Sequence, residues 1–101
     1  MDRWIVITGR QIAAARTLLG MSQGELAALS RISVPTLKRM EASAGVAAGL
    51  PNNVGAVQRS LESAGVEFIP ENGGGAGVRL KKEPPSPAAI PIEELTSEND
   101  E

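Results

Sequence analysis

The sequence contains no cysteine, no histidine and no tyrosine, and Trp4 and Phe68 are its only aromatic residues. Without Cys and His there are no disulfides, thiol nucleophiles, imidazole bases or zinc sites built on these residues. No apolar run approaches the ~20 residues of a membrane span, and the N-terminus lacks the long apolar stretch of a secretory signal. We therefore expect a cytoplasmic protein with no membrane contact, no catalytic residues, no cofactor and no metal.

The charge is unevenly distributed along the chain, although the formal net charge is only −2. Residues 1–82 carry ten basic and six acidic side chains, a net charge of +4, whereas residues 83–101 carry six acidic side chains and no basic one. Residues 83–101 also contain four prolines and few large apolar groups, so we expect a disordered acidic tail. The 101 residues otherwise suffice for one domain, whose cationic composition favours a polyanionic partner.

Three short helices are predicted within residues 9–42, because a Ser or Thr that can act as N-cap precedes each of them. Gln11 follows Thr8, and Glu25 follows Ser22, at the spacing of a capping box. The helices are expected at residues 9–19, at 23–29 and after Ser33, with Gly20 ending the first and Pro35 in the first turn of the third.

The segments around these helices complete a prediction of four parts. Residues 44–51 are interpreted as a loop, and Asn52 or Asn53 as the cap of a fourth helix that ends at Gly65. After residue 65 apolar and charged residues alternate in two short runs, which a Gly-rich stretch separates. This pattern predicts a β-hairpin. The expected organisation is an N-terminal arm or short strand (1–8), a helical domain (9–65), a hairpin (66–82) and the tail (83–101).

The connection between the second and third helices is only three or four residues long. So short a turn forces two helices to cross steeply, as in a helix-turn-helix. Apolar residues occupy the positions that such packing needs, and Ala27 falls where the helices approach most closely; the apolar set is Leu26, Ile32, Leu37 and Met40.

The segment Ser22-Gln23-Gly24-Glu25-Leu26-Ala27, followed by Ile32-Ser33 and by residues 37–41, resembles the lambda-repressor-like (XRE-family) helix-turn-helix regulators. The resemblance covers roughly residues 9–42 and implies a mainly α, four-helix DNA-binding domain. It also implies an ion pair between Arg16 and Glu41, and phosphate binding by Gln23 and by the start of the third helix. Arg31 departs from the family pattern, which usually has Gly there, and a left-handed backbone at Arg31 would be strained.

The third helix presents a face suited to the DNA major groove. On a helical wheel Ser33, Leu37 and Met40 point inward, whereas Pro35, Lys38 and Arg39 point outward. An Arg or Lys on such a helix can bond guanine, and apolar groups can touch thymine methyls. The residues predicted to contact DNA are Gln23, Arg31, Ser33, Val34, Pro35, Thr36, Lys38 and Arg39.

These observations favour a bacterial or phage-type, sequence-specific regulator of transcription, most simply a repressor, that binds double-stranded DNA as a homodimer. One recognition helix contacts few base pairs, so specificity usually requires two half-sites. Candidate dimer interfaces are the apolar segments 4–7, 66–69 and 78–80 and the face formed by Val54, Val57 and Leu61. The alternative is a protein-interaction module, such as an antitoxin or antiactivator, that uses the hairpin edge or the acidic tail to bind a protein partner.

Overall fold

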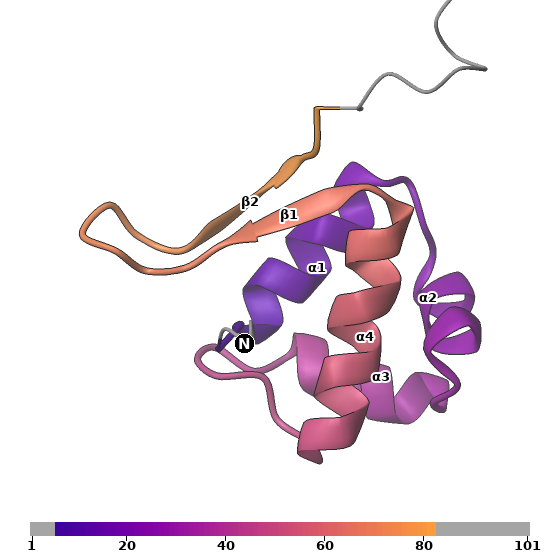
Figure 1. Cartoon of the computed structure of the whole chain (residues 1–101). Coiled ribbons are helices and arrows are strands. Elements are labelled where there is room, and N and C mark those ends of the chain that lie inside the picture. The colour runs from indigo at the N-terminus through magenta and orange to yellow at the C-terminus, as the bar shows by residue number, and fades with distance from the viewer. Residues whose placement is uncertain (1–5, 83–101) are drawn as a thin grey trace, which may run out of the picture.

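The computed structural model describes residues 6–82, and these residues form four helices followed by a two-stranded antiparallel hairpin (Figure 1). The elements are α1 (Gly9–Leu18), α2 (Gln23–Ser30), α3 (Val34–Glu41), α4 (Pro51–Ala64), β1 (Val66–Ile69) and β2 (Gly77–Leu80). The predicted four-helix, mainly α fold with a C-terminal hairpin is thus confirmed. Trp4 and the predicted acidic tail lie outside the described residues.

The two predicted capping boxes are both present. Thr8 accepts a hydrogen bond from the Gln11 N–H at the start of α1, and Ser22 accepts one from the Glu25 N–H at the start of α2. In each box the third-position side chain accepts the N–H of the cap residue in return. These reciprocal bonds satisfy backbone donors that would otherwise lack partners at a helix start.

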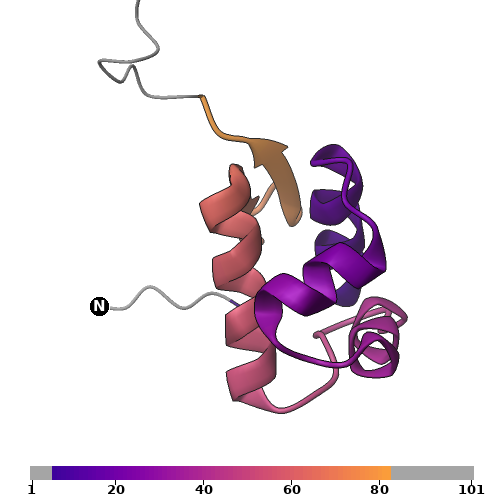
Figure 2. The same cartoon turned by 90° about the vertical axis from the view of Figure 1, so that its right-hand side faces the viewer.

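One core joins all six elements. α3 packs against α1 and α2, while β1 packs against α4 and β2 packs against α1. Figures 1 and 2 show the consequence, which is that α3 and the hairpin lie at opposite ends of the helical body. The largest fully buried side chains come from α1, α2, α3, α4, β1 and the segment before α1: Ile7, Ile12, Leu26, Leu37, Met40, Val57, Leu61 and Val66.

The side chain of Gln11 fastens the hairpin to α1. Its Nε2 donates to the carbonyl oxygen of Ile69 at 3.2 Å and to that of Gly77 at 2.9 Å. Ile69 and Gly77 face each other at one end of the β1–β2 register. Gln11 is only 5% exposed, so its amide lies inside the structure with all its bonding directed at backbone groups.

One predicted element boundary is wrong, and another segment lies mostly outside the described residues. The segment 1–8 was expected to be an arm or a short strand; of its described part, Ile7 and Thr8 make single contacts with the loop after α3, including a bridge between Thr8 and Val46. The fourth helix begins at Pro51 rather than after Asn52 or Asn53, and its N-cap Leu50 provides no side-chain hydrogen bond. Pro51 suits the first helical position because its fixed φ is helical and its missing N–H needs no partner there.

Most of the predicted dimer-interface residues are instead part of the core. Val57, Leu61 and Val66 are fully buried within one chain, and Phe68 is 6% exposed. Val54 and Val78 pack against the same core. The helical periodicity of α4 therefore reflects packing against α1 and α2, and the alternation of the strands reflects packing against α1 and α4, rather than a surface prepared for a second copy.

Across residues 6–82 the helices are all too short or too polar to span a bilayer. The same residues bring together no group of three or more acidic side chains arranged to hold a metal ion.

Candidate nucleic-acid interface

The turn between α2 and α3 consists of Arg31, Ile32 and Ser33, and it gives the two helices their steep crossing. Arg31 adopts a left-handed conformation with φ of 59°, and Ile32 N–H donates to the Ala27 carbonyl at 3.0 Å. Arg31 thus occupies a backbone region that favours Gly, as the sequence indicated. Ala27 is 2% exposed, so a larger side chain at this position would meet closely packed neighbours.

The exposed face of α3 carries two positive charges. Lys38, Arg39 and Pro35 are exposed, while Leu37 and Met40 on the opposite face are fully buried. This alternation fixes the rotation of the helix about its axis, because the core holds Leu37 and Met40. Figure 2 shows α3 almost end-on at one margin of the molecule, next to α2 and away from the hairpin.

Three other predicted contact residues, Ser33 just before α3 and Val34 and Thr36 within it, have partial structural roles. Ser33 was expected to point inward, but it is exposed and acts as the N-cap, accepting from the Thr36 N–H and donating to Thr36 Oγ1. Thr36 is half-buried. Val34 is half-buried as well and packs against the core, so only part of its side chain remains available to a ligand.

A compact ion-pair cluster links α1, α2 and α3 behind this face. Arg16 Nε donates to Glu41 Oε2 at 2.8 Å and Arg16 Nη2 donates to Glu41 Oε1 at 3.0 Å, a two-bond geometry typical of strong Arg–carboxylate pairs. The hydrogen bonds that Arg16 donates to Glu41 raise the pKa of the Arg16 guanidinium, and burial opposes this shift. A third Arg16 nitrogen donates to the Met21 carbonyl at 3.0 Å, which ties the α1–α2 connection to the same cluster.

Gln23 belongs to this cluster, a role that the sequence motif did not suggest. Its Nε2 donates to Glu41 Oε1 at 3.0 Å. The side-chain amide of Gln23 is therefore engaged within the protein. A phosphate at the start of α2 would be bound by the backbone N–H groups of the first turn, where the helix dipole also favours an anion.

The start of α3 offers fewer donors than the start of α2. Pro35 has no N–H, and the Thr36 N–H donates to Ser33 Oγ. The exposed cations Arg31, Lys38 and Arg39 instead supply the positive charge on this side of the molecule.

Together, a steeply crossed helix pair and an outward cationic helix define a helix-turn-helix. A family model described as Helix-turn-helix matches residues 12–46, about a third of the chain, and this match confirms the resemblance to the lambda-repressor-like (XRE) type. The segment is thus that of a DNA-binding helix-turn-helix regulator. A comparison with curated proteins found no match for this chain.

Proposed function

We propose that the chain is a sequence-specific regulator of transcription that inserts α3 into the major groove of double-stranded DNA. The observation that carries this proposal is the fixed orientation of α3. Leu37 and Met40 are fully buried, and they leave Pro35, Lys38 and Arg39 exposed on the opposite face. The major groove admits an α-helix and displays a distinct pattern of donors and acceptors for each base pair.

Residues of α3 and of the preceding turn divide between base and backbone contacts in this proposal. We infer that Arg39 and Lys38 donate to guanine O6 and N7, while Pro35 and the exposed parts of Val34 and Thr36 contact thymine methyl groups. Ser33, Arg31 and the first turn of α2 at Gln23 contact phosphates and thereby set the register of the protein on the duplex.

We further propose that the protein acts as a homodimeric repressor of a bacterial or phage type. α3 is eight residues long, or about 12 Å, so a single copy spans only a few base pairs. Two copies on half-sites about 34 Å apart would supply the specificity that one cannot. We also propose that the DNA-binding domain spans residues 9–65 and the hairpin residues 66–82.

The test is titration of an operator-length duplex at several salt concentrations. Binding should weaken with a log–log slope of about −0.9 for each phosphate neutralised. The K38A/R39A double variant should lose at least about tenfold in affinity and much of its preference for the operator over a random duplex, because both side chains are proposed to contact bases. The matched control is R79A/K82A, which removes two exposed charges at the opposite end of the molecule and should bind almost as the parent does. Equal losses in both variants would show that binding is a non-specific charge effect.

A separate measurement tests whether two copies bind together. Sedimentation equilibrium of the protein with and without a two-site duplex should give two copies per duplex. A single copy bound to each two-site duplex at saturating protein would contradict the dimer while leaving DNA binding intact.

A protein-interaction function is the second candidate, because the hairpin lies at the end of the molecule opposite α3 and has Leu80 53% exposed. A stoichiometric protein partner whose binding survives K38A/R39A would favour this second function. Loss of that partner in K38A/R39A would assign its binding to the α3 face instead.

A further inference from the structure

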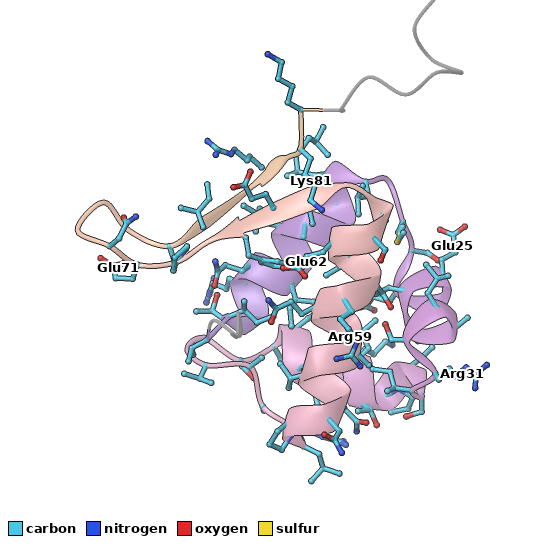
Figure 3. All side chains as sticks on the ribbon, in the orientation of Figure 1. Glu25, Arg31, Arg59, Glu62, Glu71 and Lys81 are labelled. Atoms are coloured by element: carbon cyan, nitrogen blue, oxygen red, sulfur yellow. The ribbon has the colours of Figure 1, made fainter. Side chains whose placement is uncertain are left out.

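A second surface on the described part of the chain combines positive charge with apolar side chains. It is a groove of about 660 Å³ between the end of α2 and the second half of α4. Its walls are Leu29 and Arg31 on one side and Arg59 and Ser63 on the other, and small residues form much of the remaining lining. Figure 3 shows Arg31 projecting from the end of α2 and Arg59 lying on α4.

A hydrogen bond joins the two helices at the floor of the groove. Ser30 Oγ donates to Ser60 Oγ at 3.0 Å, which joins α2 to α4, and Ser30 is 5% exposed. Leu29, in contrast, is 59% exposed although its neighbour Leu26 is fully buried. A large apolar side chain at the rim of a cationic groove favours a ligand that offers both apolar groups and carboxylates.

We propose that the C-terminal segment of the same chain binds in this groove through residues 90–95. These residues read Ile-Pro-Ile-Glu-Glu-Leu, so Glu93 and Glu94 are flanked by apolar side chains on both sides. The carboxylates would face Arg31 and Arg59, and Ile92 or Leu95 would pack against Leu29. The charges of the two parts, −6 for residues 83–101 and +4 for residues 1–82, favour the same pairing.

The chain leaves the described structure close to the groove. The Lys81 N–H donates to the Gly65 carbonyl at 2.8 Å and Lys81 Nζ donates to the Glu62 carbonyl at 3.0 Å, so the exit point is fixed beside the last turn of α4. Ser63 and Ala64, in that turn, line the groove. The stretch from Lys82 to Ile90 reaches at most about 26–29 Å, and α4 is about 21 Å long, so residues 90–95 can reach any part of the groove.

Because residues 90–95 are covalently linked to the groove through the same chain, a weak contact is sufficient for them to bind there. Attachment by a short linker gives an effective concentration in the millimolar range. An intrinsic affinity that would be negligible between separate molecules then populates the bound state. Since two of the expected contacts are between opposite charges at the surface, the bound fraction should fall as salt is raised.

A spin label on the full chain tests this contact directly. The protein contains no cysteine, so Thr96→Cys provides a single attachment point for a nitroxide. At low salt we expect selective broadening of the amide signals of Leu29, Arg31, Ser60 and Ser63, while the hairpin loop at residues 73–75 remains sharp. The same sample with the nitroxide reduced is the reference. Uniform broadening, no broadening, or broadening centred on Val6 and Val46 would overturn the proposal.

Matched variants distinguish binding in the groove from non-specific apolar contact elsewhere on the surface. Leu29→Ser should abolish the selective broadening, whereas Leu18→Ser should leave it unchanged, because Leu18 is 46% exposed on α1 outside the groove. The I92S/L95S variant should also abolish it. A mixture of isotope-labelled and spin-labelled chains identifies the other occupant, since broadening that appears only between different molecules would show that a second copy, not the same chain, fills the groove.

A consequence for DNA follows, and it rests on the proposed function. Arg31 lies both in the groove and among the proposed phosphate contacts, so an occupied groove competes with DNA. If the groove is filled nine-tenths of the time, the apparent Kd for DNA is about tenfold weaker. E93Q/E94Q should therefore tighten binding more than E98Q/D100N, which removes two charges outside residues 90–95. Equal tightening would contradict the competition, while the spin-label result would still decide whether the segment binds the groove.

Discussion

The two ends of this molecule are stabilised in different ways. The helix-turn-helix end has a capping box at the start of α2, and its ion pair joins Arg16, 19% exposed, to Glu41, 6% exposed. The hairpin end has an ion pair between Arg79 and Glu67 with side chains 65% and 47% exposed, and it is attached to α1 by the side chain of Gln11. Two ion pairs of similar geometry thus contribute differently to the free energy of unfolding, because water screens the exposed pair and not the buried one.

The largest effect is expected at Gly9, where α1 meets the end of α3. An added Cβ would lie 2.5 Å from the Ser43 carbonyl oxygen and would also clash with that of Met40, and both are backbone atoms. Gly9→Ala should lower the free energy of unfolding by about 3 kcal/mol or more, as measured by urea denaturation. Gly24→Ala is the matched control. Its nearest neighbour would be Ser22 Oγ at 3.7 Å, so it should be neutral or stabilising by up to about 1 kcal/mol.

The two ion pairs give the next largest contrast. Arg16→Met leaves Glu41 buried without its cationic partner and should cost about 2–3 kcal/mol in the free energy of unfolding. Arg79→Met should have no measurable effect in the same urea titration, because both partners are open to water. Similar losses in the two variants would refute the explanation by burial.

Gln11→Glu should weaken the hairpin selectively. The substitution keeps an acceptor for the Thr8 N–H but replaces the amide donor by a carboxylate facing the carbonyls of Ile69 and Gly77. We expect a loss of about 1–3 kcal/mol. Relative to the parent protein, the substitution should accelerate hydrogen exchange more at the amides of β1 and β2 than at those of α3. Equal acceleration in α3 would mean that the hairpin and the helices unfold as one unit.

Arg31→Gly should act in opposite directions on stability and on DNA binding. Gly relieves the left-handed strain at φ of 59° and should stabilise the fold by about 1 kcal/mol. The same change removes a proposed phosphate contact and should weaken DNA binding. Thermal unfolding and the duplex titration measure the two effects, and an unchanged melting temperature would contradict the strain argument.

The smallest expected effect is a pH dependence confined to the hairpin. Hydrogen bonding to Arg79 lowers the pKa of the Glu67 carboxyl below its ordinary value. Because the folded-state pKa is lowered, the pair stabilises the hairpin above about pH 4.3 and loses this contribution as the pH falls through the folded-state pKa. Arg79→Ala should raise the pKa of Glu67 in an NMR titration, and an unchanged value would show that the pair does not persist in solution.

Local signals accounted for most of what could be predicted. The caps at Thr8 and Ser22 were correct because each depends on residues only three positions apart. The start of α4 was predicted wrongly because Pro51, rather than an Asn side chain, begins that helix. Which way Ser33 points could not be settled by a wheel alone, because an N-cap residue lies outside the helical geometry that the wheel assumes.

The sequence by itself determined the helices, their caps and the short turn that makes α2 and α3 cross, because backbone hydrogen bonding and helical spacing are local. Only the tertiary structure decided that Val57, Leu61 and Phe68 face the core of their own chain and not a second copy. It also decided that the Gln11 amide, besides closing its cap, reaches carbonyls 58 and 66 residues away. Apolar periodicity states that a face is buried but not what covers it, and the partner of a buried polar group depends on which distant backbone atoms the fold brings within hydrogen-bond distance.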